Sequence, residues 1–260
     1  MKTLITLFIL VILLSSCGAK QNSIINPVSD WFKSNIWVNS FTKVLLGYPD
    51  YPITREMVEG IPYASLRIKI GKGPAGLMIL QEIKDDNYSY VSQDSVLIKI
   101  KKGRIIRTSR LNNNLVDYYY DNDPEFEKLI KGSISHKQIS GDISFLEIIK
   151  GNVSFYELIT FEKERFFYST RVISLDNPIV KGLAVQVYTK LESEEESIQI
   201  LDREYKVILI KEVIENKRIK WKHENLYWVD PKTGFVWKSL QQIAPNVPAI
   251  SLEITKAPSI

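Results

Sequence analysis

Runs of alternating apolar and polar residues follow one another past residue 60 and predict β-strands. Leu66, Ile68 and Ile70 alternate with Arg67 and Lys69, which is the period-two pattern of a sheet with one face toward solvent. Further short runs rich in β-branched and aromatic residues cover residues 77–83, 88–92, 96–101, 104–108, 153–161, 166–173, 183–191, 205–213, 226–229 and 235–237. So many short strands with few helices predict an all-β, mainly antiparallel fold, either a single barrel or a sandwich.

Two short segments between these runs have the composition of hairpin turns. Lys102 and Gly103 separate two strand-like runs, and a two-residue loop that ends in glycine is typical of a tight hairpin. In residues 230–234, Pro231 sets the backbone for a turn and Gly234 supplies a positive φ. Both segments therefore predict hairpins.

Helical patterns occupy three stretches of the chain. Large apolar residues recur at helical spacing in residues 30–47, where they would pack in the core or rest on a membrane surface, because tryptophan favours membrane interfaces. Residues 54–60 predict a short helix with Thr54 as the N-cap and a glycine as the stop. Residues 123–132 predict one helical insertion, since a proline stands at the first helical position.

The N-terminus has the pattern of a bacterial lipoprotein signal. Lys2 precedes an apolar run over residues 3–14, which has the length of a secretory-signal core and is shorter than the roughly 20 residues needed to cross a bilayer. The run ends in the sequence Leu-Ser-Ser-Cys-Gly, where two small residues precede the single cysteine of the chain, Cys17. Signal cleavage is therefore expected between Ser16 and Cys17.

Cys17 is the residue whose thiol would take a diacylglyceryl group, after which its freed amine would be acylated, for example with palmitate. Two or three acyl chains hold a protein on a membrane effectively permanently. Gly18 follows the cysteine, and by resemblance to the lipoprotein sorting rule this favours the outer membrane. We expect residues 1–16 to be the signal peptide, 17–28 a lipid-anchored tether and 29–260 one mainly-β domain.

Composition and charge weigh against several functions. The 260 residues are 45% hydrophobic and 25% charged, which is ordinary for a globular protein. The net charge of +4 is spread along the chain, without the clustered basic face of a nucleic-acid-binding protein. Residues 71–76 match G-x-G-x-x-G, but they contain a proline and precede a strand-like run, so no nucleotide site is expected. Two histidines and one cysteine are too few for most zinc sites, and no cofactor is expected beyond the lipid on Cys17.

A pair of catalytic carboxylates is the enzymatic alternative that sequence spacing leaves open. The nominal candidates are aspartates in loop-like segments rich in asparagine: Asp85, Asp86, Asp117, Asp121 and Asp123. Turn chemistry accounts for these residues without catalysis. The glutamates between positions 192 and 196 are interpreted as a solvated loop.

Aromatic and basic residues gather near the C-terminus and form a candidate contact site for a polymer or a partner protein. On a strand, Tyr227 and Val229 would share one face while Trp228 takes the other. Aromatic rings stack on sugar faces, and nearby cations suit acidic sugars. The alternative is packing in the core with a cross-strand aromatic pair. The candidate residues are Trp221, Tyr227, Trp228, Trp237, Arg218 and Lys222.

Several segments together resemble the YjbF/GfcB family of outer-membrane lipoproteins associated with group 4 capsule and exopolysaccharide. The resemblance rests on the lipoprotein signal around Cys17 and on residues 61–65, 90–94, 102–108, 221–223, 227–230 and Gly234. It implies a mainly-β, barrel-like protein that a lipid anchors to the outer membrane, facing the periplasm. The family pattern brings no catalytic motif, and Cys17 is the one functional residue that it transfers.

Three functions remain in view at this point. The favoured one is a non-enzymatic factor in capsule or exopolysaccharide assembly or secretion, which contacts partner secretion proteins or the polymer. The alternatives are a polysaccharide-modifying hydrolase with a carboxylate pair and a carrier of an apolar ligand inside an open barrel. A cavity lined by leucine and isoleucine would favour the carrier, and a cleft with two facing carboxylates would favour the hydrolase.

Overall fold

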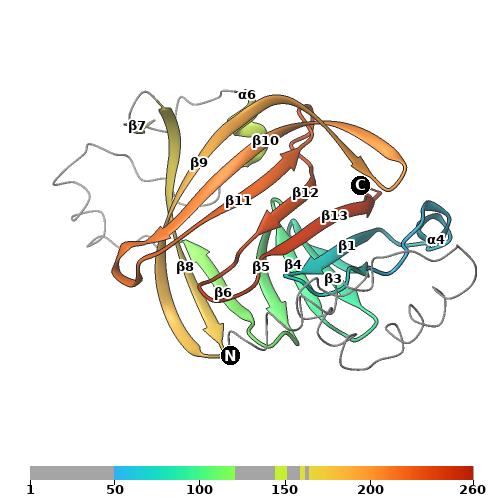
Figure 1. Cartoon of the computed structure of the whole chain (residues 1–260), viewed down its shortest axis with the longest axis horizontal. Helices are drawn as coiled ribbons and strands as arrows, with labels where there is room; N and C mark the ends of the chain where they lie inside the picture. Colours follow the sequence, from blue (N-terminus) through green and yellow to red (C-terminus); the bar gives the residue numbers. More distant parts are fainter. Residues whose placement is uncertain (1–49, 121–143, 151–158, 162–163, 260) are drawn as a thin grey trace, which may run out of the picture. The chain divides into compact units, whose positions relative to one another are not determined.

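One antiparallel sheet of thirteen strands carries the fold of the described residues (Figure 1). The computed structural model describes residues 50–120, 144–150, 159–161 and 164–259. These residues belong to one unit, residues 48–260. The predictions for the signal, the tether and the helices over 30–47 and 123–132 lie outside the described residues and stay predictions.

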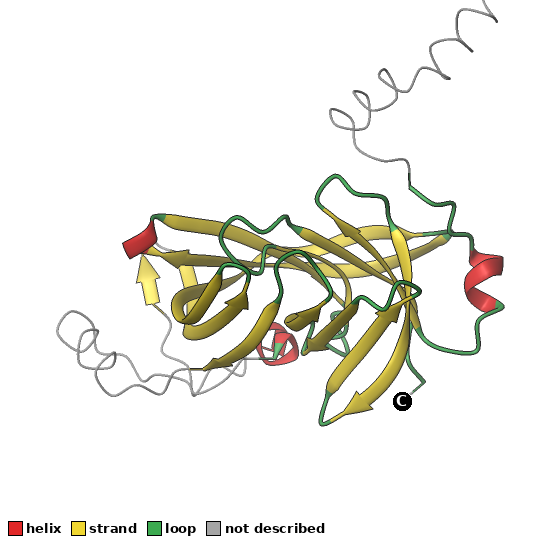
Figure 2. Ribbon diagram, turned by 90° about the horizontal axis from the view of Figure 1, so that it is seen from below, coloured by secondary structure: helices red, strands yellow, loops and turns green. Residues whose placement is uncertain are grey.

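Most of the strands are short and follow one another through hairpins, and the helices are shorter still (Figure 2). In chain order the strands are β1 (Ser65–Ile70), β2 (Gly76–Lys84), β3 (Asn87–Ser92), β4 (Leu97–Lys101), β5 (Arg104–Ser109), β6 (Leu115–Tyr120), β7 (Ile159–Phe161), β8 (Glu164–Asp176), β9 (Ile179–Ile200), β10 (Arg203–Asn216), β11 (Trp221–Val229), β12 (Val236–Gln241) and β13 (Ile250–Lys256). The helical elements described are α4 (Arg55–Glu59), α6 (Phe145–Lys150) and a 3-10 turn, η1 (Lys217–Ile219). The all-β prediction is confirmed, and α4 is the predicted short helix, capped by Thr54, which accepts a hydrogen bond from the Met57 N–H.

The sheet curls into a nearly closed barrel, so the barrel alternative holds and the sandwich does not. The strand order is β5-β4-β3-β2-β1-β13-β12-β11-β10-β9-β8-β6, with β7 paired to β8, and every pairing is antiparallel. The pairing of β1 with β13 joins the first and last described strands of the chain in the middle of this order. The last strands, β5 and β6, meet at a seam, where the Leu115 N–H donates to Thr108 Oγ1 at 2.9 Å.

Both predicted hairpin turns are confirmed. Lys102 and Gly103 join β4 to β5 with positive φ angles of 47° and 80°, which is the conformation of a two-residue hairpin that matches the strand twist. Between β11 and β12, the Asp230 N–H donates to the Phe235 carbonyl at 2.7 Å, and Gly234 has a φ of 75°. The G-x-G-x-x-G segment is likewise a connection between two strands, β1 and β2.

Some elements differ from what the sequence pattern indicates. β6, β13 and α6 have no counterpart among the predicted elements. The loop interpretation of the acidic residues near position 192 is wrong, because β9 runs on to Ile200. Glu192 lies 3.1 Å from the ammonium of Lys190 and 3.7 Å from that of Lys211. Acidic residues are therefore accommodated on the solvent-facing side of this long hairpin by cations beside them.

The inner face of the sheet holds an apolar core. Along β1, Leu66 and Ile68 are buried, while Arg67 and Lys69 between them are partly exposed, as the alternation predicts. The main cluster of buried residues includes Met78, Tyr90, Ile98, Ile105, Leu115, Ile173, Val187, Ile214, Ile250 and Leu252. Because this cluster draws on strands all around the sheet, the core forms only when the sheet has curled.

A charged cluster lies inside this core. Glu212 on β10 has no exposed surface, and its Oε1 lies 2.7 Å from Nη2 of Arg104 and 2.7 Å from Nη2 of Arg171. Its other oxygen accepts a hydrogen bond from the Tyr227 hydroxyl at 2.9 Å. Burial by itself would raise the pKa of Glu212, but the two guanidinium groups outweigh burial and lower the pKa to about 2. One ionised carboxylate therefore links β5, β8, β10 and β11.

At the seam, the side chain of Gln241 on β12 makes hydrogen bonds to the backbone that a neighbouring strand would otherwise make. Its side-chain oxygen accepts from the Ile105 N–H at 3.0 Å, and its side-chain nitrogen donates to the Gly103 carbonyl at 3.0 Å. Both are backbone groups at the start of the edge strand β5. A buried backbone group without a partner costs about 1–3 kcal/mol, so this amide lets β5 end the sheet inside the core.

α6 packs against two of the hairpin turns. The guanidinium carbon of Arg104 lies 4.1 Å from the centre of the Phe145 ring, so the helix also covers the charged cluster. A Cβ at Gly103 would lie 3.2 Å from the same ring, and a Cβ at Gly234 would lie 2.7 Å from the Cβ of Leu146. These turns therefore need glycine for close packing as well as for their positive φ angles.

Replacement of Glu212 by glutamine is expected to lower the free energy of unfolding by about 3–5 kcal/mol, because two buried guanidinium groups lose their counter-charge. Urea denaturation at neutral pH measures the change. Glu204→Gln, an exposed position on the same strand, is the matched control and should change stability by less than about 0.5 kcal/mol. Equal effects of the two substitutions would contradict the role assigned to Glu212.

The lowered pKa of Glu212 predicts that the free energy of unfolding decreases at acidic pH. Because the pKa of Glu212 is lowered on folding, from 4.5 to about 2, its contribution is complete above about pH 4.5 and is lost as the pH falls toward 2. The difference in unfolding free energy between the wild type and Glu212→Gln should therefore shrink over this interval. Denaturation series from neutral pH into that range measure it, and a difference that does not change with pH would refute the assignment.

Candidate functional site

The C-terminal aromatic residues divide between the two faces of β11. Tyr227 and Val229 are completely buried on the inner face, and Trp228 lies on the other face, as strand alternation predicts. The prediction of Tyr227 as a contact residue is wrong, because a ring without exposed surface cannot touch a polymer. Its hydroxyl donates to the buried carboxylate of Glu212 instead.

Trp221 and Trp237 are partly buried and pack against the main core cluster. The ring centre of Trp237 lies 4.1 Å from that of Tyr205 and 4.9 Å from that of Phe235. These contacts are those of an aromatic cluster that stabilises the fold. They favour the packing alternative for both tryptophans.

Trp228 is the tryptophan of this group that lies on the outer face. Its indole N–H donates to Glu196 at 3.1 Å, and the Lys238 ammonium lies 5.4 Å from its ring centre. Arg218 and Lys222 are exposed, on η1 and at the start of β11. The six sequence candidates therefore do not form one surface, and contact through Trp228, Arg218 and Lys222 stays a prediction.

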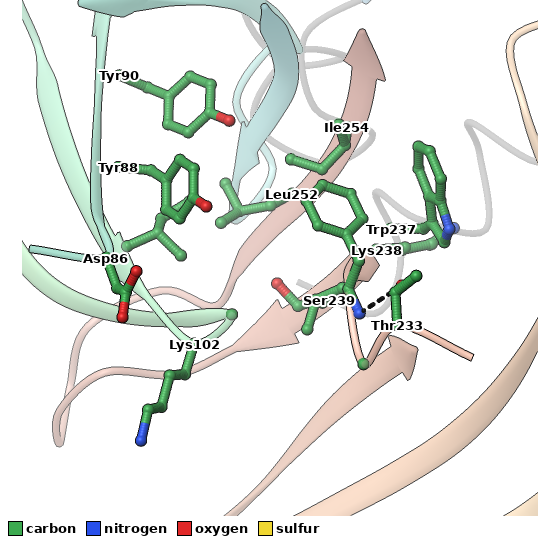
Figure 3. A pocket seen from close by; sticks show the side chains of 15 residues that line it. Asp86, Tyr88, Tyr90, Lys102, Thr233, Trp237, Lys238, Ser239, Leu252 and Ile254 are labelled. Carbon is green, nitrogen blue, oxygen red and sulfur yellow. Dashed lines mark hydrogen bonds between the residues drawn. The ribbon is translucent and has the colours of Figure 1, made fainter. Parts of the chain in front are cut away.

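A cavity of about 320 Å³ lies between β3 and β4 on one side and β12 and β13 on the other (Figure 3). Its walls are mainly aromatic and aliphatic, from Tyr88, Tyr90, Ile100, Phe235, Leu252 and Ile254. Pockets for small ligands typically have volumes of about 300–1,000 Å³ and combine apolar walls with a few polar groups. In size and lining, this cavity has the character of a small-ligand site.

Two tyrosine hydroxyls are directed into this cavity. Tyr88 and Tyr90 stand two residues apart on β3, and Figure 3 shows both hydroxyls pointing toward the wall that carries Leu252 and Ile254. The Tyr90 side chain is almost completely buried, with 2% of its surface exposed, and burial raises the pKa of its hydroxyl above the usual value of 10. Within the described part of the chain, the Tyr90 hydroxyl makes no hydrogen bond.

Turns between strands supply polar groups at the rim of the cavity. Asp86 comes from the β2–β3 turn, Lys102 from the β4–β5 turn and Thr233 from the β11–β12 turn. Thr233 Oγ1 accepts a hydrogen bond from the Phe235 N–H at 3.2 Å, drawn as the dashed line in Figure 3. The Lys102 side chain extends away from the tyrosines in the same view, and the ammonium of Lys238, which also lines the cavity, lies 2.9 Å from Glu253. Asp86 is therefore the charged group beside the tyrosines.

The carboxylate candidates do not form a facing pair at this cavity. Asp85 and Asp86 make the β2–β3 turn, with positive φ angles of 49° and 60°, and Asp86 is the one carboxylate among the described residues of the lining. Asp117 is exposed on β6, and Asp121 and Asp123 lie outside the described residues. The hydrolase alternative therefore gains no support here, since it needs two carboxylates across the sugar.

The described ranges of the chain contain neither a metal-binding cluster nor a membrane-spanning helix. No group of histidine, cysteine, aspartate and glutamate in those ranges could hold a metal ion. In the same ranges, no helix is long and apolar enough to pass through a bilayer.

Sequence reasoning did not identify this cavity. Part of its signal is visible in the sequence, because Tyr88 and Tyr90 alternate with Ser89 and must share one face of a strand. The opposite wall, however, comes from β12 and β13, near the other end of the chain. No spacing rule relates these two parts before the sheet curls.

Comparison with known proteins identifies the class to which this chain belongs, the capsule-associated lipoproteins. Residues 38–255 match the family described as "Group 4 capsule polysaccharide lipoprotein gfcB, YjbF". The chain belongs to this YjbF family, so the family resemblance drawn from its motifs is confirmed.

The similar proteins come from Escherichia coli K12. The uncharacterized lipoprotein GfcB is 21% identical over 250 residues, and the uncharacterized lipoprotein YjbF is 21% identical over 251 residues; each match covers 96% of both chains. The crystal structure of the hypothetical lipoprotein YmcC is 16% identical, with a TM-score of 0.58, over 94% of this chain and 100% of that one. At this identity the structural likeness shows the fold alone.

Alanine substitutions are expected to distinguish a tryptophan that packs in the core from one that lies on the outer face. Trp237→Ala should lower the free energy of unfolding by about 3 kcal/mol, because the ring packs in the core cluster. Trp228→Ala removes an outer-face hydrogen bond and a cation–π contact and should cost about 1–2 kcal/mol. Urea denaturation of both variants measures the difference. If Trp228→Ala lowered the free energy of unfolding as much as Trp237→Ala does, Trp228 would also be a packing residue.

Proposed function

We propose that this protein is a non-enzymatic lipoprotein of the outer membrane that acts in the assembly or secretion of a capsule or exopolysaccharide. Membership of the YjbF family is the observation that carries the proposal. The protein acts by contact with partner secretion proteins or with the polymer. Its domain faces the periplasm and is held at the membrane by the lipid on Cys17.

The lipid anchor is supported by the N-terminal sequence and by the names of the relatives. An apolar run that ends in two serines before Cys17 is the pattern that a lipoprotein signal requires. Both E. coli relatives are named lipoproteins. Gly18 after the cysteine supports the outer membrane as the destination of the mature protein.

A binding role fits the cavity better than a hydrolytic one does. The lining includes one carboxylate among the described residues, whereas hydrolysis of a glycosidic bond needs two. A carrier of an apolar ligand is a second candidate, because Ile100, Leu252 and Ile254 give the cavity aliphatic walls. In both cases the protein acts by binding and leaves the chemistry to other components.

The anchor is tested with Cys17→Ala. Because the thiol is the acceptor of the lipid, a clickable palmitate analogue should label the wild type and leave this variant unlabelled. Polymer on the cell surface should fall in a deletion strain and in the Cys17→Ala strain, with protein amounts followed by immunoblot. Normal polymer in the deletion strain would overturn the proposed role, and a labelled variant would overturn the anchor.

The membrane to which the protein is sorted is tested separately from the lipid anchor with Gly18→Asp. This variant keeps the acceptor cysteine, but an aspartate after the cysteine is the signal for retention in the inner membrane. Membrane fractionation should therefore find the lipidated variant in the inner membrane, while the matched control Gly18→Ser stays in the outer membrane. Recovery of both variants in one membrane fraction would contradict the sorting assignment.

A further inference from the structure

We infer that the cavity between β3–β4 and β12–β13 binds a neutral sugar residue of a glycan, with the hydroxyls of Tyr88 and Tyr90 as its hydrogen-bonding groups. The inference rests on the proposed function in one respect, since a polysaccharide pathway is the source of such a ligand. The site itself is defined by the residues that line the cavity.

The Tyr90 hydroxyl sets the chemistry of the ligand. Its side chain is 98% buried, and within the described residues no protein group pairs with the hydroxyl, although it is directed into an open volume. The oxygen itself opens onto the cavity and is not one of the fully buried side-chain atoms that lack a partner in the described residues, so its hydrogen-bonding capacity is available to a molecule in the cavity. A ligand that carries hydroxyl groups would pair with Tyr90 and Tyr88, whereas an acyl or isoprenoid chain would leave both unpaired.

The remaining walls of the cavity are apolar and suit the C–H faces of a sugar ring. Leu252 and Ile254 face the tyrosines across the cavity with apolar surface (Figure 3), and Phe235 adds an aromatic ring to the lining. The faces of a pyranose ring present C–H groups, and its edge presents hydroxyls. A sugar placed with its edge toward the Tyr88 and Tyr90 hydroxyls would therefore lay its apolar faces along these walls.

Charge and size narrow the ligand further. The charged residues of the lining are Asp86, Lys102 and Lys238. Lys102 extends away from the tyrosines (Figure 3), and the Lys238 ammonium lies 2.9 Å from a carboxylate oxygen of Glu253, so Asp86 is the charge beside the tyrosines. A carboxylate accepts hydrogen bonds from sugar hydroxyls but repels a uronic acid, so the site selects a neutral residue. The volume of about 320 Å³ equals that of roughly ten water molecules, which suits one or two sugar units.

The test uses the lipidated full-length protein in lipid nanodiscs, with empty nanodiscs as the blank. Saturation-transfer-difference NMR is recorded with methyl glycosides and disaccharides of glucose, galactose and mannose, and titrations give the dissociation constants. Tyr90→Phe removes one oxygen atom from the cavity wall. It should weaken binding about three- to tenfold, as expected for one hydrogen bond, without lowering the melting temperature.

The matched control is Tyr63→Phe, at an exposed tyrosine outside the cavity lining, which should leave binding unchanged. A role of Tyr90 in stability alone would lower the melting temperature and leave the dissociation constant as it was. Failure of every neutral probe to bind, or equal affinity in Tyr90→Phe, would overturn the inference. So would tighter binding of methyl glucuronide than of methyl glucoside, or binding of oleate that Tyr90→Phe strengthens.

The outcome can be separated from that of the proposed function. If deletion of the gene abolishes surface polymer while the purified protein binds no sugar, the cavity assignment fails and the proposed role stands. If the protein binds neutral sugars through Tyr90 but deletion leaves surface polymer unchanged, the site stands and the capsule role fails.

Discussion

The buried contact of Glu212 with Arg104 and Arg171 is the interaction on which the closed shape of the sheet depends. Burial of a carboxylate is costly, and the two guanidinium groups, 2.7 Å away, make it tolerable only when β5, β8 and β10 are all in place. The Tyr227 hydroxyl adds β11 to the same carboxylate. A sheet that curled with another register would leave a charge unpaired in the core, so the cluster selects one closure of the barrel from the alternatives.

The seam of the barrel is organised around the same cluster. Gln241 supplies hydrogen bonds to the start of β5 that a neighbouring strand would otherwise make, and α6 places Phe145 over Arg104. The β4–β5 turn lines the cavity and packs so near Phe145 that a Cβ at Gly103 would lie 3.2 Å from its ring. The closure that satisfies the buried charges therefore also positions one rim of the cavity.

The proposed lipid anchor and the cavity belong to different parts of the chain and depend on different physical interactions. Anchoring requires one acceptor cysteine after an apolar run, and it works through the hydrophobic effect of acyl chains whatever the domain looks like. The cavity requires hydroxyls of β3 and apolar residues of β13 to face one another across a curled sheet. Under the proposed function, the lipid would hold the protein at the membrane, and the curled sheet would supply the binding site.

The sequence by itself determined the features that depend on neighbouring residues. Alternation along residues 66–70 assigned a strand and its inner face, and glycines at 103 and 234 marked two turns, because backbone conformation is a local property. The tertiary structure alone decided the rest. It moved Tyr227 from a candidate contact to the core, and it brought Tyr90 opposite Leu252. These contacts join residues far apart in the chain, and their geometry exists only once β1 has paired with β13.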